Sequence, residues 1–234
     1  MGRITHYNED LSLRFFDANN ASSFALTHQK QPSSHSRLGV VRVVTQQLQN
    51  FARQSIFDAL SALFLRPEEP ETLPRLLDAM HAASGLANEL GVDPAPFEAL
   101  ANRAQSSPRE LATEYMALFV NDSALALTET AWTPADPSGL PVAQLKCRQT
   151  YIEAGLETAG LIGIAEDHLA LQLAFTAVLI LKEDLKGAST FFDQHLANWL
   201  PIFIEALRER DDAQFFKAVA HVLEGVCEIE KECR

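Results

Sequence analysis

The stretch Ile164–Leu181, IAEDHLALQLAFTAVLIL, places two acids and a histidine directly before the most apolar run of the chain. Between Leu169 and Leu181, only Gln172 and Thr176 are polar. A membrane-spanning helix needs roughly 20 consecutive apolar residues, and this run is clearly shorter. It therefore predicts a helix buried in the core of a globular protein rather than a membrane span.

Two interpretations of the charged residues before this helix are open. Glu166 and Asp167 can cap the helix and complement its dipole, which contributes about 0.5–2 kcal/mol, with His168 half exposed in the first turn. Alternatively, the three residues form a binding site whose carboxylates contact basic groups of a ligand. Asp167→Asn separates the two, because asparagine caps about as well but carries no charge. In a site, a His168 protonated below about pH 6.5 would weaken the binding of a basic ligand.

The composition favours an all-α fold. The chain has 234 residues, of which 47% are hydrophobic and 21% charged, as is typical of a globular protein with a sizeable core. It has only 10 glycines, and alternating Val, Ile and Thr patterns are scarce. The net charge of −12 argues against a nucleic-acid partner, because nucleic-acid-binding proteins normally present a basic face.

Apolar residues recur at three- and four-residue intervals over most of the chain, which predicts a bundle of about seven to eight helices. The predicted ranges are 43–64, 73–90, 97–104, 108–119, 142–156, 167–186, 190–208 and 212–230. Gly91 is a typical helix stop, and Ser107 begins a capping box with proline at the first helical position. A second capping box, Asp211–Gln214, is expected to begin the last helix.

The segment 121–141 has no periodicity and contains Trp132 among prolines, aspartates and a glycine. Loops of this length in compact domains are usually functional or join domains. We therefore expect a hinge loop at 121–141 between an N-terminal helical part, 41–120, and a C-terminal part, 142–234. Residues 1–40 are polar and rich in turn formers, and they predict a mobile extension.

The cysteines and the N-terminus indicate a cytoplasmic protein. Cys147, Cys227 and Cys233 form no C-x-x-C pair, so the sequence predicts neither a disulfide framework nor a zinc site. Free thiols are typical of a reducing compartment. The first 16 residues lack the apolar segment of a signal peptide, so secretion is not expected.

The usual catalytic and cofactor motifs are absent from the sequence: there is no G-x-S-x-G, no P-loop, no G-x-G-x-x-G and no H-E-x-x-H. We therefore expect no enzymatic activity, no cofactor and no metal. One alternative stays open, namely a helical metal- or ligand-binding enzyme that uses His168, His195 and nearby acids.

Five segments, in order along the chain, resemble the TorD/DmsD/NarJ family of cytoplasmic chaperones, which mature molybdenum-containing respiratory oxidoreductases. They are RQSIFDALSALF at 53–64, EYMALF at 114–119, RQTYIEAGL at 148–156, Asp167-His168, and FDQHLANWLP at 192–201. The resemblance covers roughly residues 45–230. The chain departs from the family where Ala165-Glu166 replaces the usual Glu-Pro before Asp-His, so it resembles a divergent member.

The resemblance implies an all-helical chaperone without chemistry of its own. Such a chaperone binds the twin-arginine signal peptide, or the adjacent N-terminus, of a client molybdoenzyme precursor and delays export until the cofactor is inserted. In this chain the residues implied for peptide binding are Trp132, Glu166, Asp167 and His168. A monomer or homodimer without stable membrane insertion is expected.

Overall fold

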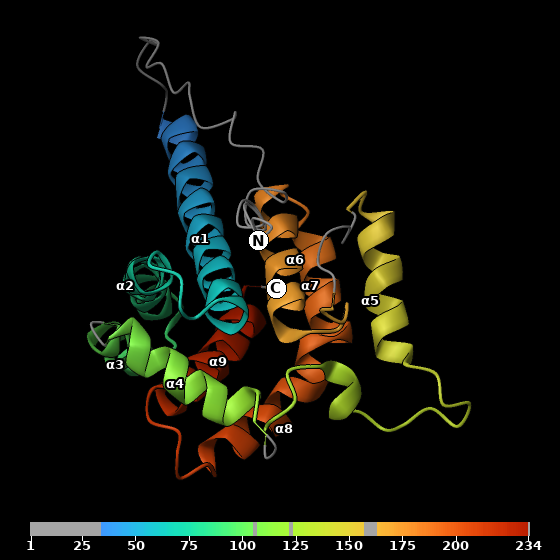
Figure 1. Ribbon diagram of the computed structural model, residues 1–234. Helices are drawn as coiled ribbons and strands as arrows, with labels where there is room; N and C mark the ends of the chain where they lie inside the picture. The colour runs from blue at the N-terminus through green and yellow to red at the C-terminus, as the bar shows by residue number, and fades with distance from the viewer. Residues whose placement is uncertain (1–33, 105–106, 122–123, 157–162, 234) are drawn as a thin grey trace, which may run out of the picture.

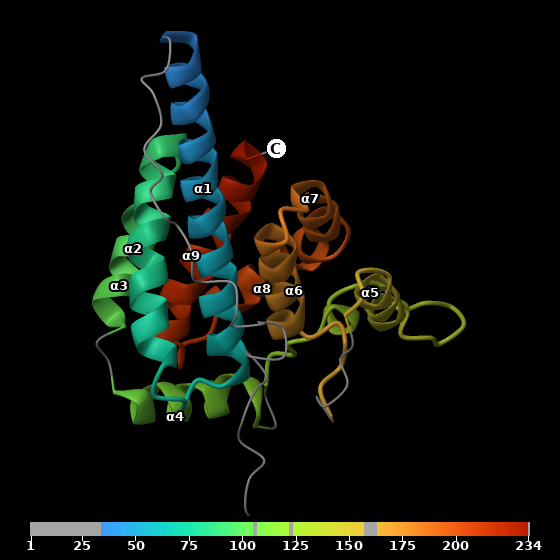
Figure 2. The same cartoon turned by 90° about the horizontal axis from the view of Figure 1, so that it is seen from above.

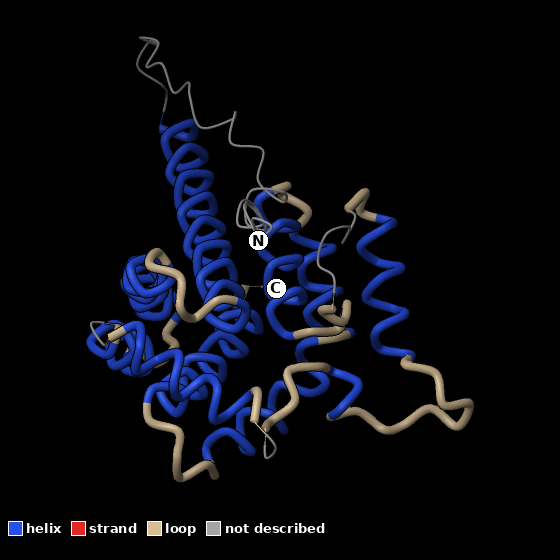
Figure 3. The backbone as a smooth tube through the Cα atoms, in the orientation of Figure 1, coloured by secondary structure: helices blue, strands red, loops and turns tan. Residues whose placement is uncertain are grey.

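The computed structural model describes residues 34–104, 107–121, 124–156 and 163–233, with side chains from residue 45 onward. Within these ranges the chain forms nine α-helices and one 3₁₀ helix, and no strand is present (Figures 1 and 3). The helices are α1 (Ser34–Leu65), α2 (Thr72–Leu90), α3 (Ala95–Arg103), α4 (Pro108–Phe119), η2 (Glu129–Ala131), α5 (Val142–Glu153), α6 (Leu169–Leu181), α7 (Leu185–Gln194), α8 (Leu196–Arg208) and α9 (Phe215–Glu232). The predicted all-α class is confirmed.

Local signals fix several helix ends as predicted. Gly91 ends α2 in the left-handed conformation, with φ 74°, which a residue without a side chain adopts at little cost. Ser107 is the N-cap of α4, and its hydroxyl accepts a hydrogen bond from the backbone N–H of Arg109. The first described helix, α1, begins at Ser34, which is earlier than the predicted start at Val43. The predicted extension lies, up to residue 33, outside the described residues.

Two of the predicted helices are each interrupted, which raises the number above the expected seven or eight. The range 167–186 ends at Leu181, and Glu183 then takes φ 61°. Asp184 starts α7 by accepting a hydrogen bond of 2.9 Å from the Gly187 N–H. The range 190–208 breaks at His195, which separates α7 from α8. Periodicity misses such breaks, because one to three non-helical residues hardly shift the apolar pattern.

A single hydrophobic core includes side chains from both predicted parts of the bundle. The long helix α1 packs along α2 on one side and α6 on the other, and α9 packs on α2, α3 and α8 (Figures 1 and 2). Large side chains without exposed surface come from both parts: they include Phe57, Phe64, Phe97, Trp199, Phe203 and Phe216. The loop at 121–141 therefore does not divide the core.

Helix α5 lies at the side of the bundle in both views (Figures 1 and 2). Its main neighbour is η2, and only Cys147 and Tyr151 of its side chains are buried. Leu145 and Ile152 expose about half of their surface. Helix α5 is thus held by few contacts. In the part of the chain that the structure describes, no helix combines the length and the apolar character needed to cross a bilayer.

The last helix is capped from a distant part of the chain rather than by the predicted capping box. Gln214, the N-cap of α9, makes no side-chain cap hydrogen bond. Instead, the carboxylate of Glu114 in α4 accepts hydrogen bonds from the N–H groups of Gln214, Phe215 and Phe216, at 2.8, 3.0 and 2.9 Å. A carboxylate at this position satisfies unpaired N–H groups and complements the helix dipole. The Asp211–Gln214 prediction is wrong because a tertiary contact supplies the cap.

We expect Glu114→Ala to lower the free energy of unfolding by about 1.5–3 kcal/mol, since it removes charge-assisted hydrogen bonds from three backbone donors. Urea unfolding followed by circular dichroism measures the change. Glu110→Ala, an exposed acid of the same helix, is the matched control and should cost less than about 1 kcal/mol. Equal effects of the two variants would contradict the capping role.

Candidate functional site

The segment before α6 is hydrogen-bonded to the loop that contains η2. The Asp167 carboxylate accepts hydrogen bonds from the backbone N–H and the hydroxyl of Thr130, at 2.8 and 2.5 Å. The backbone N–H of Glu129 donates to the Asp167 carbonyl at 3.1 Å, and that of Leu169 donates to the Leu127 carbonyl at 2.7 Å. Asp167 is only 1% exposed. It therefore fixes the loop to the start of α6.

His168, not an acid, is the N-cap of α6. Its backbone is extended, with φ −68° and ψ 137°, and its Nδ1 accepts a hydrogen bond of 3.2 Å from the Ala170 N–H. Of the two interpretations of the segment, the one in which Glu166 and Asp167 cap this helix is wrong. The reason is positional: the N-cap is the extended residue directly before the first helical residue, and Asp167 precedes it.

Burial changes the charge state expected of His168. Desolvation lowers its pKa to about 4, although the nearby Asp167 charge acts in the opposite direction. The ring is therefore neutral at physiological pH, as its acceptor role at Nδ1 requires. The expectation that His168 becomes charged below about pH 6.5 is wrong, because that value applies to a solvated imidazole.

The lowered pKa of His168 predicts an acid-sensitive stability. Between pH 6.5 and pH 4 the unfolded chain binds a proton at His168 that the folded chain does not bind, so stability rises with pH across this window. We expect the contribution, about 2–3 kcal/mol, to be complete above pH 6.5 and to be lost as the pH falls toward 4. His168→Asn keeps a capping acceptor and removes the titration. Urea unfolding at pH 8 and pH 4.5 should show a smaller loss in the variant than in the wild type; equal losses would contradict the assignment.

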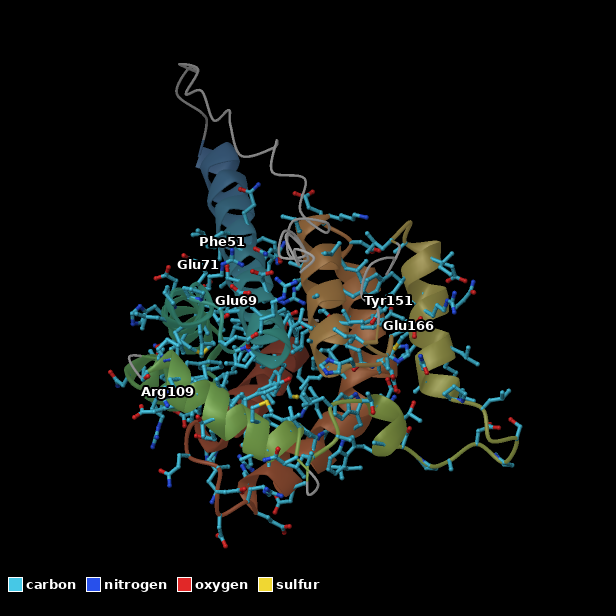
Figure 4. All side chains as sticks on the ribbon, viewed as in Figure 1. Phe51, Glu69, Glu71, Arg109, Tyr151 and Glu166 are labelled. Carbon is cyan, nitrogen blue, oxygen red and sulfur yellow. The ribbon has the colours of Figure 1, made fainter. Side chains whose placement is uncertain are left out.

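Glu166 is the more accessible of the two acids. Its side chain is 16% exposed and accepts a hydrogen bond from Gln144 Nε2 at 2.5 Å, while Arg148 Nε lies 3.9 Å from Oε1. Its backbone carbonyl accepts a hydrogen bond of 2.9 Å from the hydroxyl of Tyr151 in α5, and the two residues are labelled close together in Figure 4. The contact with Arg148 is long, and that arginine is 63% exposed. The Glu166 carboxylate can therefore release Arg148 and bind another guanidinium at little cost in free energy.

Trp132 is half-buried and borders a groove. Its Nε1 donates a hydrogen bond of 2.8 Å to the Ala126 carbonyl, and its ring packs edge-on against Phe203 with centroids 5.9 Å apart. The groove has a volume of 790 Å³ and lies between residues 129–143, Lys146 and one side of α8. Two apolar side chains at its border, Leu140 and Ile202, expose 56% and 51% of their surface.

A buried polar cluster lies behind this groove. The Nδ1 of His195 is 2.8 Å from Glu129 Oε2 and 3.3 Å from Cys147 Sγ. Gln172 Nε2 donates to the same Glu129 oxygen at 2.6 Å, and Trp199 Nε1 donates to Gln172 Oε1 at 3.0 Å. All five residues are buried. The cluster joins η2, α5, α6, the α7–α8 junction and α8.

In this state the cluster does not supply a reactive nucleophile. Burial raises the pKa of the Cys147 thiol to about 12, so it is protonated at neutral pH. The imidazole of His195 donates to Glu129, or forms an ion pair with it when protonated. The alternative interpretation was an enzyme that uses His168 and His195 together. The two histidines lie in different places, because His195 belongs to this cluster whereas His168 caps α6.

Sequence reasoning did not assign Glu129, Cys147 or Gln172 to a site. These residues are separated along the chain by 18 or more positions, so no short motif links them. One signal was available: Gln172 is an amide inside an apolar run. A buried amide needs hydrogen-bond partners, and here Glu129 and Trp199 are two of them.

Comparisons with known proteins agree with the resemblance drawn from the motifs. The family described as nitrate reductase delta subunit matches residues 81–205, more than half of the chain. The chaperone protein TorD of Shewanella piezotolerans is 28% identical over 188 residues, which covers 74% of this chain and 87% of the relative. The chaperone protein TorD of Photobacterium profundum is 23% identical over 189 residues, covering 75% of this chain and 79% of the relative. The matched region includes Trp132, Glu166–His168 and the buried cluster.

Proposed function

The chain belongs to the nitrate reductase delta subunit family, as a divergent TorD-like member, and from this premise we propose that it binds the twin-arginine leader or adjacent N-terminus of its client. It is a molybdoenzyme maturation chaperone. In the proposal, binding holds the precursor back from export until its molybdenum cofactor is inserted. The protein acts by binding alone, as a monomer or homodimer in the cytoplasm, without catalysing a reaction.

The groove beside Trp132 is the observation that carries the proposal. A twin-arginine leader has a basic pair followed by an apolar stretch. The groove offers an apolar surface that can cover this stretch. Trp132, Leu140 and Ile202 border it, and the last two are more than half exposed. Exposed apolar side chains gathered at a hollow are typical of a site that covers an apolar segment of a partner.

Glu166 supplies the group for the basic pair. Its side chain lies beside Gln144 and Arg148 of α5. Two other residues of α5, Ala143 and Lys146, line the groove. A guanidinium of the leader can replace Arg148, whose Nε is 3.9 Å away, with a shorter charge-assisted bond. The net charge of −12 also favours approach of a basic peptide.

Asp167 and His168 contribute to the proposed site by positioning it. The Asp167 carboxylate holds Thr130, two residues before Trp132, and His168 fixes the start of α6. Asp167 is buried, so a direct bond to arginine would require it to leave Thr130. We therefore assign direct peptide contacts to Trp132 and Glu166, and support of the loop to Asp167 and His168.

Replacing groove residues should weaken leader binding without destabilising the protein. We expect Leu140→Ser and Ile202→Ser each to reduce the affinity for a twin-arginine leader peptide by about 1–3 kcal/mol, as loss of an apolar anchor does. Isothermal titration measures the affinity, and thermal unfolding should change by little because both residues are exposed. Leu48→Ser is the matched control, since Leu48 is 63% exposed on α1 and is not part of the groove.

Glu166→Gln in the same titration tests the basic end of the leader. It should weaken binding at low salt, and the difference from the wild type should shrink as salt rises, because the pair is partly exposed. A leader whose two arginines are replaced by glutamine should bind the wild type and the variant equally. If Leu140→Ser, Ile202→Ser and Glu166→Gln all bind like Leu48→Ser, the leader site lies elsewhere.

A further inference from the structure

Three side chains that commonly bind metals meet behind the groove: a carboxylate, a thiol and an imidazole. Glu129, Cys147 and His195 come from η2, α5 and the α7–α8 junction, and one ligand atom of each lies within 4.8 Å of the others. All three residues are buried. We propose that this cluster binds one divalent metal ion of the zinc type.

The distances between the three ligand atoms fit such an ion. Nδ1 of His195 and Oε2 of Glu129 are 2.8 Å apart, Sγ of Cys147 and Nδ1 are 3.3 Å apart, and Sγ and Oε2 are 4.0 Å apart. Tetrahedral zinc at its usual bond lengths separates such atoms by about 3.4–3.6 Å. Side-chain shifts of about half an ångström therefore complete the triangle.

The chemistry of the set selects the class of metal. A thiolate and an imidazole favour a borderline ion such as zinc over magnesium or calcium, which prefer oxygen ligands. A dipositive ion is balanced by one thiolate and one carboxylate, so the occupied site carries no net charge. On binding, the Cys147 thiol releases its proton to solvent, and the proton of the neutral His195 ring moves from Nδ1 to Nε2, so that the Nδ1 lone pair faces the ion.

The surroundings hold two of these groups in a ligand-like orientation. Gln172 Nε2 lies 2.6 Å from Glu129 Oε2 and 3.4 Å from Cys147 Sγ. Trp199 Nε1 bonds Gln172 Oε1, which fixes the amide with its N–H groups toward the oxygen and the sulfur. Donors of this kind stabilise carboxylate and thiolate ligands, and they orient metal ligands in known sites.

An ion can reach the cluster from two hollows. Glu129 lines the groove beside Trp132, and His195 lines a second hollow of 610 Å³, with Lys146 and Asn198 at the border of both. Three protein ligands leave one position of a tetrahedral ion for water. The site therefore needs no further side chain.

A bound ion would tie α5 to the body of the bundle. Cys147 is one of only two buried side chains of α5, whose main neighbour is η2. Coordination to Glu129 and His195 therefore fixes a helix that has few other contacts and that borders the groove. Metal binding at this cluster is independent of leader binding, because its three ligands are buried and are not among the proposed peptide contacts.

Cobalt(II) is the probe that tests the site, because a thiolate ligand gives it an intense near-ultraviolet charge-transfer band and tetrahedral geometry gives strong visible bands. The full chain is stripped with chelator, refilled with cobalt, and then titrated with zinc. We expect one ion per chain, with the bands present when Cys147 is the only cysteine, in Cys227→Ser/Cys233→Ser. Zinc at a hundredfold excess over its Kd should raise the Tm by roughly 5–10 °C.

Variants of the cluster separate a metal site from a hydrogen-bonded network. Cys147→Ser should abolish the charge-transfer band, His195→Gln should weaken binding at least a hundredfold, and Gln172→Leu should weaken it about 10–100-fold. If a cluster variant does not fold, the cobalt spectrum of Cys227→Ser/Cys233→Ser and the number of ions that it binds still decide whether the cluster is a metal site. Absence of the band in that protein, or of a saturable single ion, would show that the cluster is only a hydrogen-bonded network.

Discussion

Replacing Glu230 with glutamine should lower the free energy of unfolding by about 3–5 kcal/mol, one of the largest effects expected in this protein. Glu230 in α9 forms two hydrogen bonds with the Arg53 guanidinium in α1, at 2.7 and 2.6 Å. The two side chains are 1% and 3% exposed. The variant keeps the shape of the side chain but leaves a buried arginine without its counter-charge, and a buried uncompensated charge is strongly unfavourable.

Burial by itself lowers the pKa of Arg53, but the hydrogen bond and charge of Glu230 outweigh it and raise that pKa. Glu224→Gln is the matched control, because Glu224 lies on the same helix, pairs with Arg208 and is 51% exposed. It should cost less than about 1 kcal/mol. Arg53→Met combined with Glu230→Leu should recover most of the stability, since both charges are then absent. Urea unfolding compares the variants, and equal losses for both glutamine substitutions would contradict the assignment.

Replacing Trp199 with alanine should also cost about 3–5 kcal/mol, since the indole is fully buried and its removal leaves a large cavity. The ring packs edge-on against Phe203 at 5.6 Å, and Phe203 in turn contacts Trp132 at the groove. The indole N–H also occupies Gln172 Oε1, so the variant leaves a buried acceptor unpaired. The loss therefore has an apolar and a polar component.

Trp199→Phe separates the two components. Phenylalanine keeps most of the buried area but has no N–H, so we expect a smaller loss of about 1–3 kcal/mol. Ile202→Ala on the same helix is the control for an exposed position and should change stability by less than about 1 kcal/mol. Urea unfolding measures the free energy of unfolding of all three variants, and the shift of the midpoint gives the change in stability if the m-value is unchanged. A Trp199→Phe protein as unstable as Trp199→Ala would assign most of the effect to the hydrogen bond.

The sequence determined those features that depend on neighbours along the chain. The apolar run at 169–181 predicted a core helix because periodicity and burial are both local properties, and all of its residues but two are buried in the structure. Gly91 and Ser107 predicted helix ends because their conformations and hydrogen bonds involve residues at most a few positions away.

Only the tertiary structure decided which polar groups meet. Glu114 caps a helix about 100 positions further along the chain, and Arg53 pairs with a carboxylate 177 positions away. The Asp167 carboxylate bonds Thr130, and His168, directly before the first helical residue, supplies the cap that one interpretation of the sequence gave to the acids. A polar side chain has several possible partners of similar energy, and the packing of the helices decides which one lies within 3 Å. For the same reason no spacing in the sequence linked Glu129, Cys147 and His195, which three separate elements bring together in the core.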